Sequence, residues 1–213
     1  MKILDIKELA LPEVKIIRHA RFADDRGYFT ESYQQSLFEG DAALKDIFTN
    51  RGIAQINESY SKPNTIRGLH MQWAPPQGKL VRTLTGHMID VVVDIRPDSP
   101  RFGQGIMYDM PADPSQPFGE LIWVPFGFAH GNYYPQESRI EYMVTSEWSG
   151  PGGEGGINPF SDDIDWTLCD AQLLAGFRTI ANGTPLVTGK DRDGFTIESW
   201  KHTAQAKNFT YKA

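Results

Sequence analysis

Hydrophobic and polar residues alternate along much of this chain, most clearly between His87 and Arg96. Isoleucine or valine occupies positions 89, 91, 93 and 95, so one side of an extended strand there would be wholly apolar. The opposite side carries Asp90 and Asp94, and Pro97 follows directly. The pattern predicts a strand over residues 87–96 that ends at a proline-containing turn.

Shorter runs of the same kind follow this strand and are separated by turn residues. They span residues 105–109, 121–124, 131–134 and 139–147. Glycine, proline and asparagine punctuate the connections, and helical periodicity is largely absent between residue 53 and the C-terminal part. This spacing favours an all-β fold, a double-sheet roll or barrel, over βαβ units.

The first third of the chain predicts an arm and a hairpin that precede the main fold. Residues 14–17 are rich in β-branched side chains and indicate a strand, residues 24–27 indicate a turn, and residues 28–33 indicate a second strand. A short helix is expected over residues 42–48, where apolar residues have helical spacing. Residues 170–177 predict another short helix.

The length of 213 residues suits one all-β domain with a sizeable core. We expect a single domain over residues 1–213, with an N-terminal arm over about residues 1–50 and a C-terminal extension over about residues 170–213. The glycine-rich run at 149–156 lacks the lysine and the hydroxyl residue of a phosphate-binding loop, so it predicts a mobile surface loop.

The charge balance narrows the classes of partner. A formal net charge of −6 and a pI near 5.4 argue against nucleic acid or an anionic membrane, although a few arginines can still form a local positive pocket. The chain has no signal-peptide pattern and no apolar run near about 18 residues, so we expect a soluble, cytoplasmic protein. Cys169 is the single cysteine, which rules out an internal disulfide framework and a thiolate cluster for zinc.

Residues 55–96 combine the strand pattern with an unusual density of polar, potentially catalytic side chains. They include Arg67, His70, Gln72, Lys79 and Arg82. Buried strands rarely carry so many polar groups unless these groups have partners or a function. The segment therefore predicts a ligand site inside the β-fold.

Six short motifs follow one another through the chain. They are DRGYF (25–29), QIN (55–57), RGLHMQ (67–72), GKLVR (78–82), DVVVDIR (90–96) and PFGFAHG (125–131). This ordered set resembles the dTDP-4-dehydrorhamnose 3,5-epimerases, a cupin-type jelly-roll family, over roughly residues 10–195. The resemblance implies a double-stranded β-helix, the cupin jelly roll, with short flanking helices, and an isomerase activity.

The implied reaction is epimerisation at C3, C5 or both of a nucleotide-linked 4-keto-6-deoxy or related 4-keto sugar. A base removes a proton next to the carbonyl, a cation holds the enolate oxygen, and an acid reprotonates the opposite face. By resemblance, His70 is the base, Lys79 stabilises the enolate and Tyr142 donates the proton. Tyr142 shares strand parity with Ile140, so it can point into the interior.

The same resemblance implies that Asp191 pairs with the catalytic histidine and fixes its tautomer. Asp165 and Asp193 are alternatives for this role, because the local match around Asp191 is short.

Further residues match positions that bind the substrate in the family. The positions within the pocket are Gln55, Asn57, Arg67 and His130. Three more, Arg26, Phe29 and Glu31, match a segment that in relatives helps to form the site of the neighbouring subunit. Arginine suits a diphosphate because it can form two parallel hydrogen bonds. We therefore expect a nucleotide-diphosphate sugar as the substrate and a homodimer as the assembly.

A metal site is not expected. Many cupins bind a metal through a closely spaced His-x-His pair, but here His70 is followed by Met71 and Gln72, so the second imidazole is missing. We predict neither a metal nor another cofactor.

Three positions depart from the family pattern. Met71 stands where relatives have an aromatic residue, Asn132 where they have phenylalanine, and Met143 where they have lysine. The nucleotide base, the sugar, the inverted carbon and the pathway therefore stay open. A nucleotide-sugar 3,4-ketoisomerase and a noncatalytic sugar-nucleotide-binding jelly roll are the alternative functions.

Overall fold

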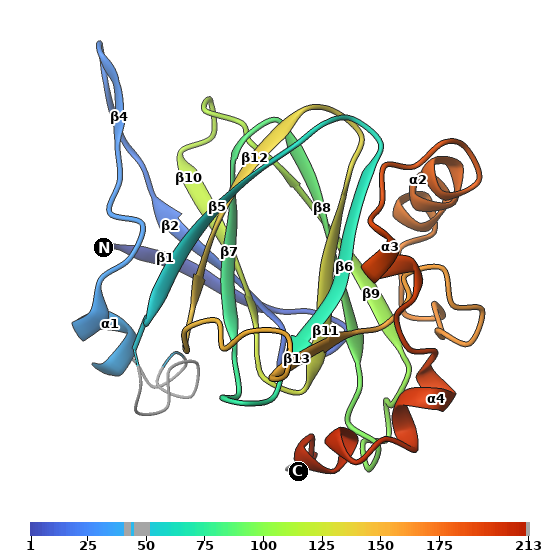
Figure 1. The fold of residues 1–213 in the computed structure, drawn as a ribbon. Helices are drawn as coiled ribbons and strands as arrows, with labels where there is room; N and C mark the ends of the chain where they lie inside the picture. The colour runs from blue at the N-terminus through green and yellow to red at the C-terminus, as the bar shows by residue number, and fades with distance from the viewer. Residues whose placement is uncertain (41–43, 45–51, 212–213) are drawn as a thin grey trace.

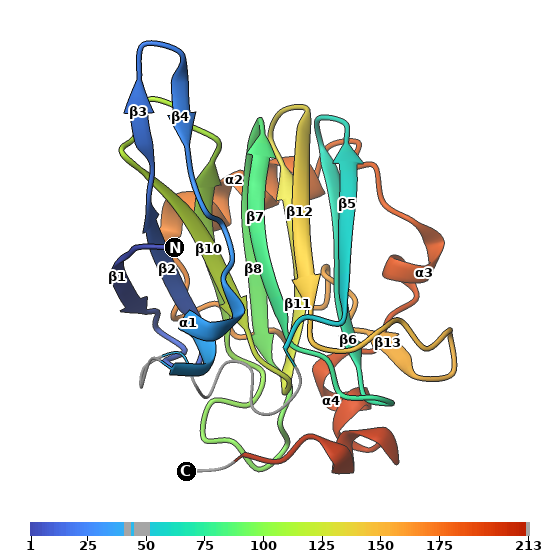
Figure 2. The same ribbon diagram turned by 90° about the vertical axis from the view of Figure 1, so that its left-hand side faces the viewer.

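Two antiparallel β-sheets face each other and form the body of the protein (Figure 1). The computed structural model describes residues 1–40, 44 and 52–211. The strand order is β1-β2-β10-β7-β12-β5 in a six-stranded sheet and β13-β6-β11-β8-β9 in a five-stranded sheet. A separate hairpin, β3–β4, projects from the body (Figure 2). The expected all-β jelly roll is confirmed.

The strands of the six-stranded sheet are β1 (Ile3–Glu8), β2 (Lys15–Ala20), β10 (Phe118–Val124), β7 (Lys79–Thr85), β12 (Ser138–Val144) and β5 (Gln55–Ser61). Those of the five-stranded sheet are β13 (Glu154–Gly156), β6 (Thr65–Gln72), β11 (Phe128–Tyr134), β8 (His87–Asp94) and β9 (Gly105–Pro111). The hairpin consists of β3 (Phe22–Asp24) and β4 (Gly27–Phe29).

The apolar side of β8 faces outward, away from the space between the sheets. Ile89, Val91 and Val93 pack with Trp200 and Phe177 from the C-terminal segment. The residues between them point inward: Val92 joins Val81 and Ile122 of the other sheet in an inner core. Both sides of β8 are therefore buried, and its acidic residues lie on the side that faces the interior.

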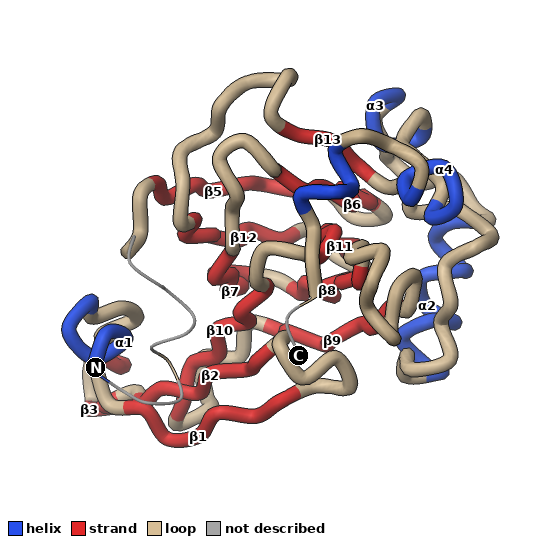
Figure 3. The backbone as a smooth tube through the Cα atoms, turned by 90° about the horizontal axis from the view of Figure 1, so that it is seen from below, coloured by secondary structure: helices blue, strands red, loops and turns tan. Residues whose placement is uncertain are grey.

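Short helices cover the outer faces of both sheets (Figure 3). On the five-stranded sheet these are α2 (Ala171–Ala181), α3 (Gly189–Arg192), α4 (Ile197–Lys201) and a 3₁₀ turn at Gln205–Asn208. The predicted helix at residues 170–177 is confirmed and extends to Ala181. The Asp170 carboxylate caps its start by accepting from the backbone nitrogens of Gln172 and Leu173. On the six-stranded sheet, α1 (Gln35–Gly40) buries Phe38.

The hairpin predicted in the first third is confirmed as β3–β4, but its second strand and the arm differ from the prediction. The predicted strand at 28–33 stops at Phe29, because the Thr30 hydroxyl donates to the Ala20 carbonyl instead of continuing the ladder. The arm is not separate from the main fold, since β1 and β2 extend the six-stranded sheet. The predicted helix at 42–48 lies outside the described residues, apart from the buried Leu44.

The glycine-rich run was also predicted incorrectly at its end. Residues 154–156 form β13, which pairs with β6, and Gly156 stands opposite His70. Glycine is required here by close approach: a Cβ on Gly155 would lie 2.9 Å from the Trp73 ring. The end of the run is thus an edge strand of the sheet that carries the candidate base.

No helix among the described residues is long and apolar enough to cross a membrane.

Trp200→Ala should lower the free energy of unfolding by about 3–5 kcal/mol. The side chain is fully buried among the C-terminal aromatic rings, and its indole nitrogen donates to the Ile95 carbonyl at 2.8 Å. Urea denaturation of the variant measures the loss. Trp148→Ala is the matched control, because Trp148 is 58% exposed, and it should change stability by less than about 1 kcal/mol. Equal losses in the two variants would contradict this account of the outer core.

Candidate active site

A cavity of about 270 Å³ lies between the two sheets at the edge formed by β5 and β6. It is lined by six of the residues predicted from the sequence, namely Arg67, His70, Lys79, His130, Tyr142 and Asp191. It is also lined by Ser59, Gly131, Asn132, Ile140, Thr188 and Lys190, which were not predicted as site residues. Four catalytic candidates that are far apart in the chain thus share one cavity.

His70 and Asp191 are in direct contact. The Nε2 atom of His70 lies 2.7 Å from Oδ1 of Asp191, whose side chain is 4% exposed. Asp191 is held by the first turn of α3, where the Thr188 hydroxyl accepts from its backbone nitrogen. Burial opposes ionisation of Asp191, but hydrogen bonds from His70 and Thr188 lower its pKa overall.

The two alternative acids have other partners. Asp165 accepts from the Thr167 backbone and the Gln104 amide, and Asp193 is an exposed residue at the end of α3. The contact with His70 therefore belongs to Asp191.

A local distortion of β6 lies directly before His70. Gly68 has a φ of +107°, and a Cβ there would lie 2.7 Å from the Cα of Gly131 on β11. The register between β6 and β11 shifts at this point, and His70 comes to lie opposite His130. Glycine at both positions lets the two backbones approach closely enough for the histidines to share the cavity.

Lys79 brings a cation to the same place. Its Nζ atom donates to the backbone carbonyl of His70 at 3.3 Å. Desolvation lowers the pKa of Lys79 to about 8, although the negative charges of Asp90 and Glu154 act to raise it. The ammonium group can therefore stabilise a negative charge, and it can also release its proton near pH 8.

A second histidine–carboxylate pair lies at the buried end of the cavity. His130 Nε2 is 2.8 Å from Oδ2 of Asp90, and the same oxygen accepts from the Asn132 amide at 3.0 Å. Burial lowers the pKa of His130, although Asp90 acts in the opposite direction. Asp90 was not predicted as a site residue, but its place on the inward side of the clearest strand was a usable signal.

Tyr142 points into the interior, as its parity with Ile140 predicted. Its hydroxyl forms no hydrogen bond with the part of the chain that the structure describes. Burial raises the pKa of Tyr142, so the phenol keeps its proton near neutral pH. A protonated hydroxyl that faces the cavity is a suitable proton donor.

His70 and Tyr142 approach the cavity from opposite sheets. His70 lies on β6 of the five-stranded sheet, whereas Tyr142 lies on β12 of the six-stranded sheet. A planar ligand between the sheets would meet a base on one face and an acid on the other. This arrangement can remove a proton from one side of a carbon and return a proton to the other side.

The exposed rim of the cavity is basic. Arg67 donates from Nε to the Ser61 hydroxyl at 2.9 Å and from Nη2 to the Tyr60 carbonyl at 2.9 Å. Lys190 forms an ion pair of 2.5 Å with Glu154. Arg67 retains free guanidinium hydrogens there that can contact an anionic group.

Five predicted substrate residues do not line the cavity. Gln55 and Asn57 lie on β5, where the Gln55 amide donates to Asn57 at 2.6 Å and its oxygen accepts from the Trp148 backbone. Arg26, Phe29 and Glu31 lie on or beside the β3–β4 hairpin. Within one chain this hairpin lies away from β6, the strand that carries His70 (Figure 1). Arg26 pairs with Asp24, and Glu31 contacts the N-terminal amino group.

Sequence reasoning missed Ser59 although a signal was available. It follows Gln55 and Asn57 at the same two-residue spacing on β5, so it shares their inward face.

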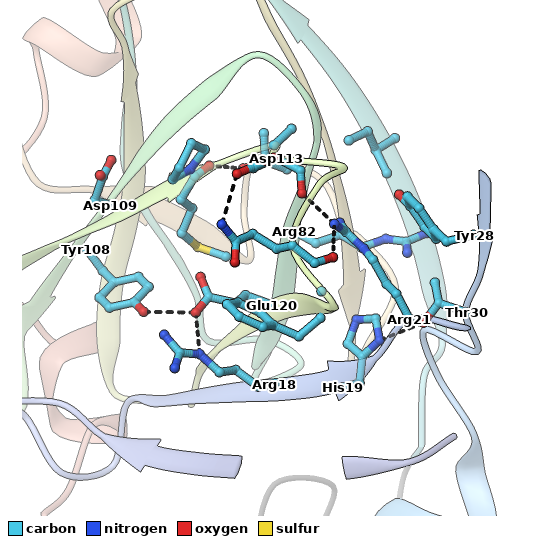
Figure 4. A pocket seen from close by; sticks show the side chains of 18 residues that line it. Arg18, His19, Arg21, Tyr28, Thr30, Arg82, Tyr108, Asp109, Asp113 and Glu120 are labelled. Atoms are coloured by element: carbon cyan, nitrogen blue, oxygen red, sulfur yellow. Dashed lines mark hydrogen bonds and ion pairs between the residues drawn. The ribbon is translucent and has the colours of Figure 1, made fainter. Parts of the chain in front are cut away.

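A second cavity of about 380 Å³ opens beside the hairpin (Figure 4). Charged side chains of its wall already have partners within the protein: Arg18 forms an ion pair with Glu120, and Arg21 donates to the backbone carbonyl of Asp113. Burial and the nearby arginines lower the pKa of His19 to about 4, so this imidazole is neutral. Tyr108 also lines this cavity, but its hydroxyl donates to Glu120 at 3.3 Å. The cavity between the sheets, which Tyr142 and His70 enter from opposite sides, is therefore the better candidate for proton transfer.

Within the described ranges, no group of three or more histidine, cysteine, aspartate or glutamate side chains is arranged to hold a metal ion.

Comparison with known proteins places these residues in a family context. The family model described as dTDP-4-dehydrorhamnose 3,5-epimerase matches residues 8–199. The chain is 40% identical over 170 residues to the dTDP-4-dehydrorhamnose 3,5-epimerase of Salmonella typhimurium, which covers 78% of this chain and 87% of the relative. It is 39% identical to the enzyme of the same name from Pseudomonas aeruginosa, over 78% and 88% of the two chains.

Solved structures show the same similarity. A dTDP-6-deoxy-D-glucose-3,5-epimerase from Legionella pneumophila Philadelphia 1, in complex with dTDP-4-keto-L-rhamnose, superposes with a TM-score of 0.78. That chain is 29% identical, and the match covers 98% of this chain and 99% of the other. A dTDP-4-dehydrorhamnose 3,5-epimerase from Bacillus anthracis with TDP and PPi bound is 30% identical, with a TM-score of 0.71 over 90% and 98% of the chains.

Lys79 should titrate near pH 8 in the ligand-free protein, well below the usual lysine value of 10.5. NMR of protein labelled with ¹³C at the lysine ε-carbons measures this, and Lys79→Met assigns the signal by its loss. Between pH 8 and 10.5 the unfolded chain binds more protons at this residue, so its contribution to the free energy of unfolding rises with pH. Lys79→Met should remove that rise. A Lys79 signal that titrates only above pH 10 would contradict the desolvation of this ammonium.

Proposed function

The chain belongs to the dTDP-4-dehydrorhamnose 3,5-epimerase family, and we propose that its own cavity inverts C3, C5 or both of a dTDP-linked 4-keto sugar. The enzyme class is that of an isomerase. The observation that carries the proposal is the placement of His70 and Tyr142 on opposite sheets, facing one cavity. Inversion requires this arrangement, because the proton must leave one face of the carbon and return to the other.

The proposed first step is removal of a proton next to the C4 carbonyl by His70. Asp191 occupies Nε2 of the imidazole, which leaves Nδ1 as the basic atom. The electrons of the broken C–H bond move to the carbonyl oxygen and form an enolate. Lys79 is the cation in the same wall, and it stabilises the oxygen where the charge develops.

The proposed second step is proton delivery by Tyr142. The enolate collapses as its carbon takes the phenol proton on the face opposite His70, so one C–H bond is broken and one is formed. His70 has then gained a proton and Tyr142 has lost one. Exchange of both groups with water restores the starting state, which is why the reaction should carry solvent hydrogen into the product.

The basic rim is the proposed site for the diphosphate. Arg67 and Lys190 both line the cavity and are exposed to solvent. Guanidinium groups bind phosphate oxygens through paired, charge-assisted hydrogen bonds. The relatives of known structure were solved with dTDP-4-keto-L-rhamnose and with TDP, which supports a thymidine nucleotide for this chain as well.

We also propose a homodimer in which the β3–β4 hairpin reaches the cavity of the other subunit. Phe29 is 66% exposed on this hairpin, and the side chain of Arg26 is exposed too. The β5 strand is an edge of its sheet, with Ile56 and Tyr60 exposed. Exposed aromatic groups and an unpaired strand edge are features that association would cover.

His70→Asn should abolish deuterium incorporation from heavy water at C3 and C5. Loss of the base removes the first step, and general base catalysis typically contributes about 10²- to 10⁴-fold. NMR of dTDP-linked 4-keto-6-deoxy sugars in heavy water locates the deuterium.

His87→Asn is the control for this experiment. His87 lies at the start of β8, where it contacts Asp109, and it is not part of the cavity between the sheets. This variant should retain full exchange. Undiminished wash-in with His70→Asn would rule out the proposed base, and movement of the carbonyl between carbons would indicate a ketoisomerase instead.

Co-expression of His70→Asn and Arg26→Ala chains should restore activity that each variant lacks alone. In a mixed dimer, one site combines an intact His70 with an intact Arg26 from the other chain. Random pairing makes half of the dimers mixed, so activity should recover to about one quarter of the wild type.

If Arg26 acted within its own chain, every site of the mixed dimer would keep one defect and no recovery would occur. Gel filtration of each sample checks the assembly, and a clean monomer would also contradict the proposal.

A further inference from the structure

The cavity has an exposed end and a buried end. Arg67 and Lys190 are exposed to solvent, whereas Asn132 and Ile140 are buried. Ser59 joins them from β5, and its hydroxyl oxygen is shielded from solvent. A ligand that enters between the sheets therefore meets a polar inner wall that the proposed proton transfers do not use.

Asn132 presents an acceptor to this cavity. Its Nδ2 atom donates to Asp90 at 3.0 Å and to the Met88 sulfur at 3.1 Å, which uses both amide hydrogens. A carboxylate can only accept, so Asp90 fixes the orientation of the amide. Oδ1 is left with one long contact, from the Tyr134 hydroxyl at 3.4 Å. The amide oxygen has capacity for a further hydrogen bond.

Ser59 presents a hydroxyl without a well-formed hydrogen bond. Its Oγ atom is buried, and no partner among the described residues meets normal hydrogen-bond geometry. The nearby Tyr134 hydroxyl is a weak partner, because the interaction with Ser59 lowers the pKa of this phenol, which burial raises to about 12. Tyr134 thus lies near both Ser59 and Asn132. A buried hydroxyl that lacks a well-formed hydrogen bond is unfavourable, so a ligand group that forms this hydrogen bond should bind strongly.

We propose that Ser59 and Asn132 together recognise one hydroxyl group of the sugar. The hydroxyl would donate to Asn132 Oδ1 and accept from Ser59 Oγ, which satisfies both wall groups. Ile140 beside them offers only an apolar surface. The inference rests on the proposed function and adds a specificity: the enzyme selects a 4-keto sugar that carries a hydroxyl at the carbon facing this wall and rejects the deoxy analogue.

A panel of dTDP-linked 4-keto hexoses that differ by one hydroxyl, at C2, C3 or C6, tests the proposal. Initial rates of deuterium wash-in give kcat/KM for each sugar. In the wild type, one hydroxyl should raise kcat/KM by about 10- to 100-fold over its deoxy partner, because the analogue leaves buried polar groups unpaired. In Ser59→Ala the ratio for that pair should fall to within about 3-fold of unity. Ser59→Thr, which keeps a hydroxyl, should retain most of the discrimination.

Ile140→Val is the matched control, since it changes the same wall without changing a polar group. Its ratio of kcat/KM between the hydroxylated and the deoxy sugar should equal that of the wild type. If Ser59→Ala does not fold, Asn132→Leu provides a second test, because it removes the Oδ1 acceptor. Wild-type ratios near unity for every pair, or an unchanged ratio in these variants, would overturn the recognition of a hydroxyl while leaving the epimerase intact. Absence of wash-in from every sugar would overturn the proposed function together with this inference.

Discussion

Desolvation of ionisable groups between two sheets is the constraint on which the candidate site depends. It lowers the pKa of Lys79 from 10.5 to about 8, a shift that corresponds to roughly 3 kcal/mol, and it raises the pKa of Tyr142. Both shifts favour the neutral form of the group. For the phenol this preserves the proton that it would donate, and for the lysine it brings deprotonation close to working pH. Asp191 resists the same effect because His70 and Thr188 donate to it.

A polar interior is possible because the fold places much of its apolar packing elsewhere. One cluster lies outside the five-stranded sheet, where Trp200 and Phe177 of the C-terminal segment cover β8. Another lies outside the six-stranded sheet, under Phe38 of α1. The inner core around Val81 and Val92 fills only part of the space between the sheets. The outer layers therefore stabilise the sheets, and one end of the interior is left for polar groups.

The sequence predicted the parts of the site that depend on local pattern or on resemblance. Strand parity placed Tyr142 on an inward face, and the motif around His70 identified the candidate base. The contacts that depend on long-range register were harder to predict. β13 was mistaken for a loop because its glycines are explained by contacts with the neighbouring chain segment, and not by any local alternation. Gly155 lies against the Trp73 ring, and Gly156 lies against the Leu69 carbonyl. The partners of Asp90 were missed because Asn132 and His130 meet it only through the pairing of β11 with β8, two strands that are far apart in the sequence.

The two histidine–aspartate pairs have similar contacts but different access to water, and this difference distinguishes the roles proposed for them. His70 and His130 lie opposite each other on neighbouring strands, each within 2.8 Å of a carboxylate oxygen. The His70 side chain is 36% exposed, whereas that of His130 is 7% exposed. A base that accepts a carbon-bound proton in every turnover must return it to solvent. Burial lowers the pKa of His130, and although Asp90 opposes this shift, Lys79 and His70 add to it, so the neutral form of His130 is favoured. His70 therefore suits proton exchange, and His130 suits a fixed, neutral contact to the ligand.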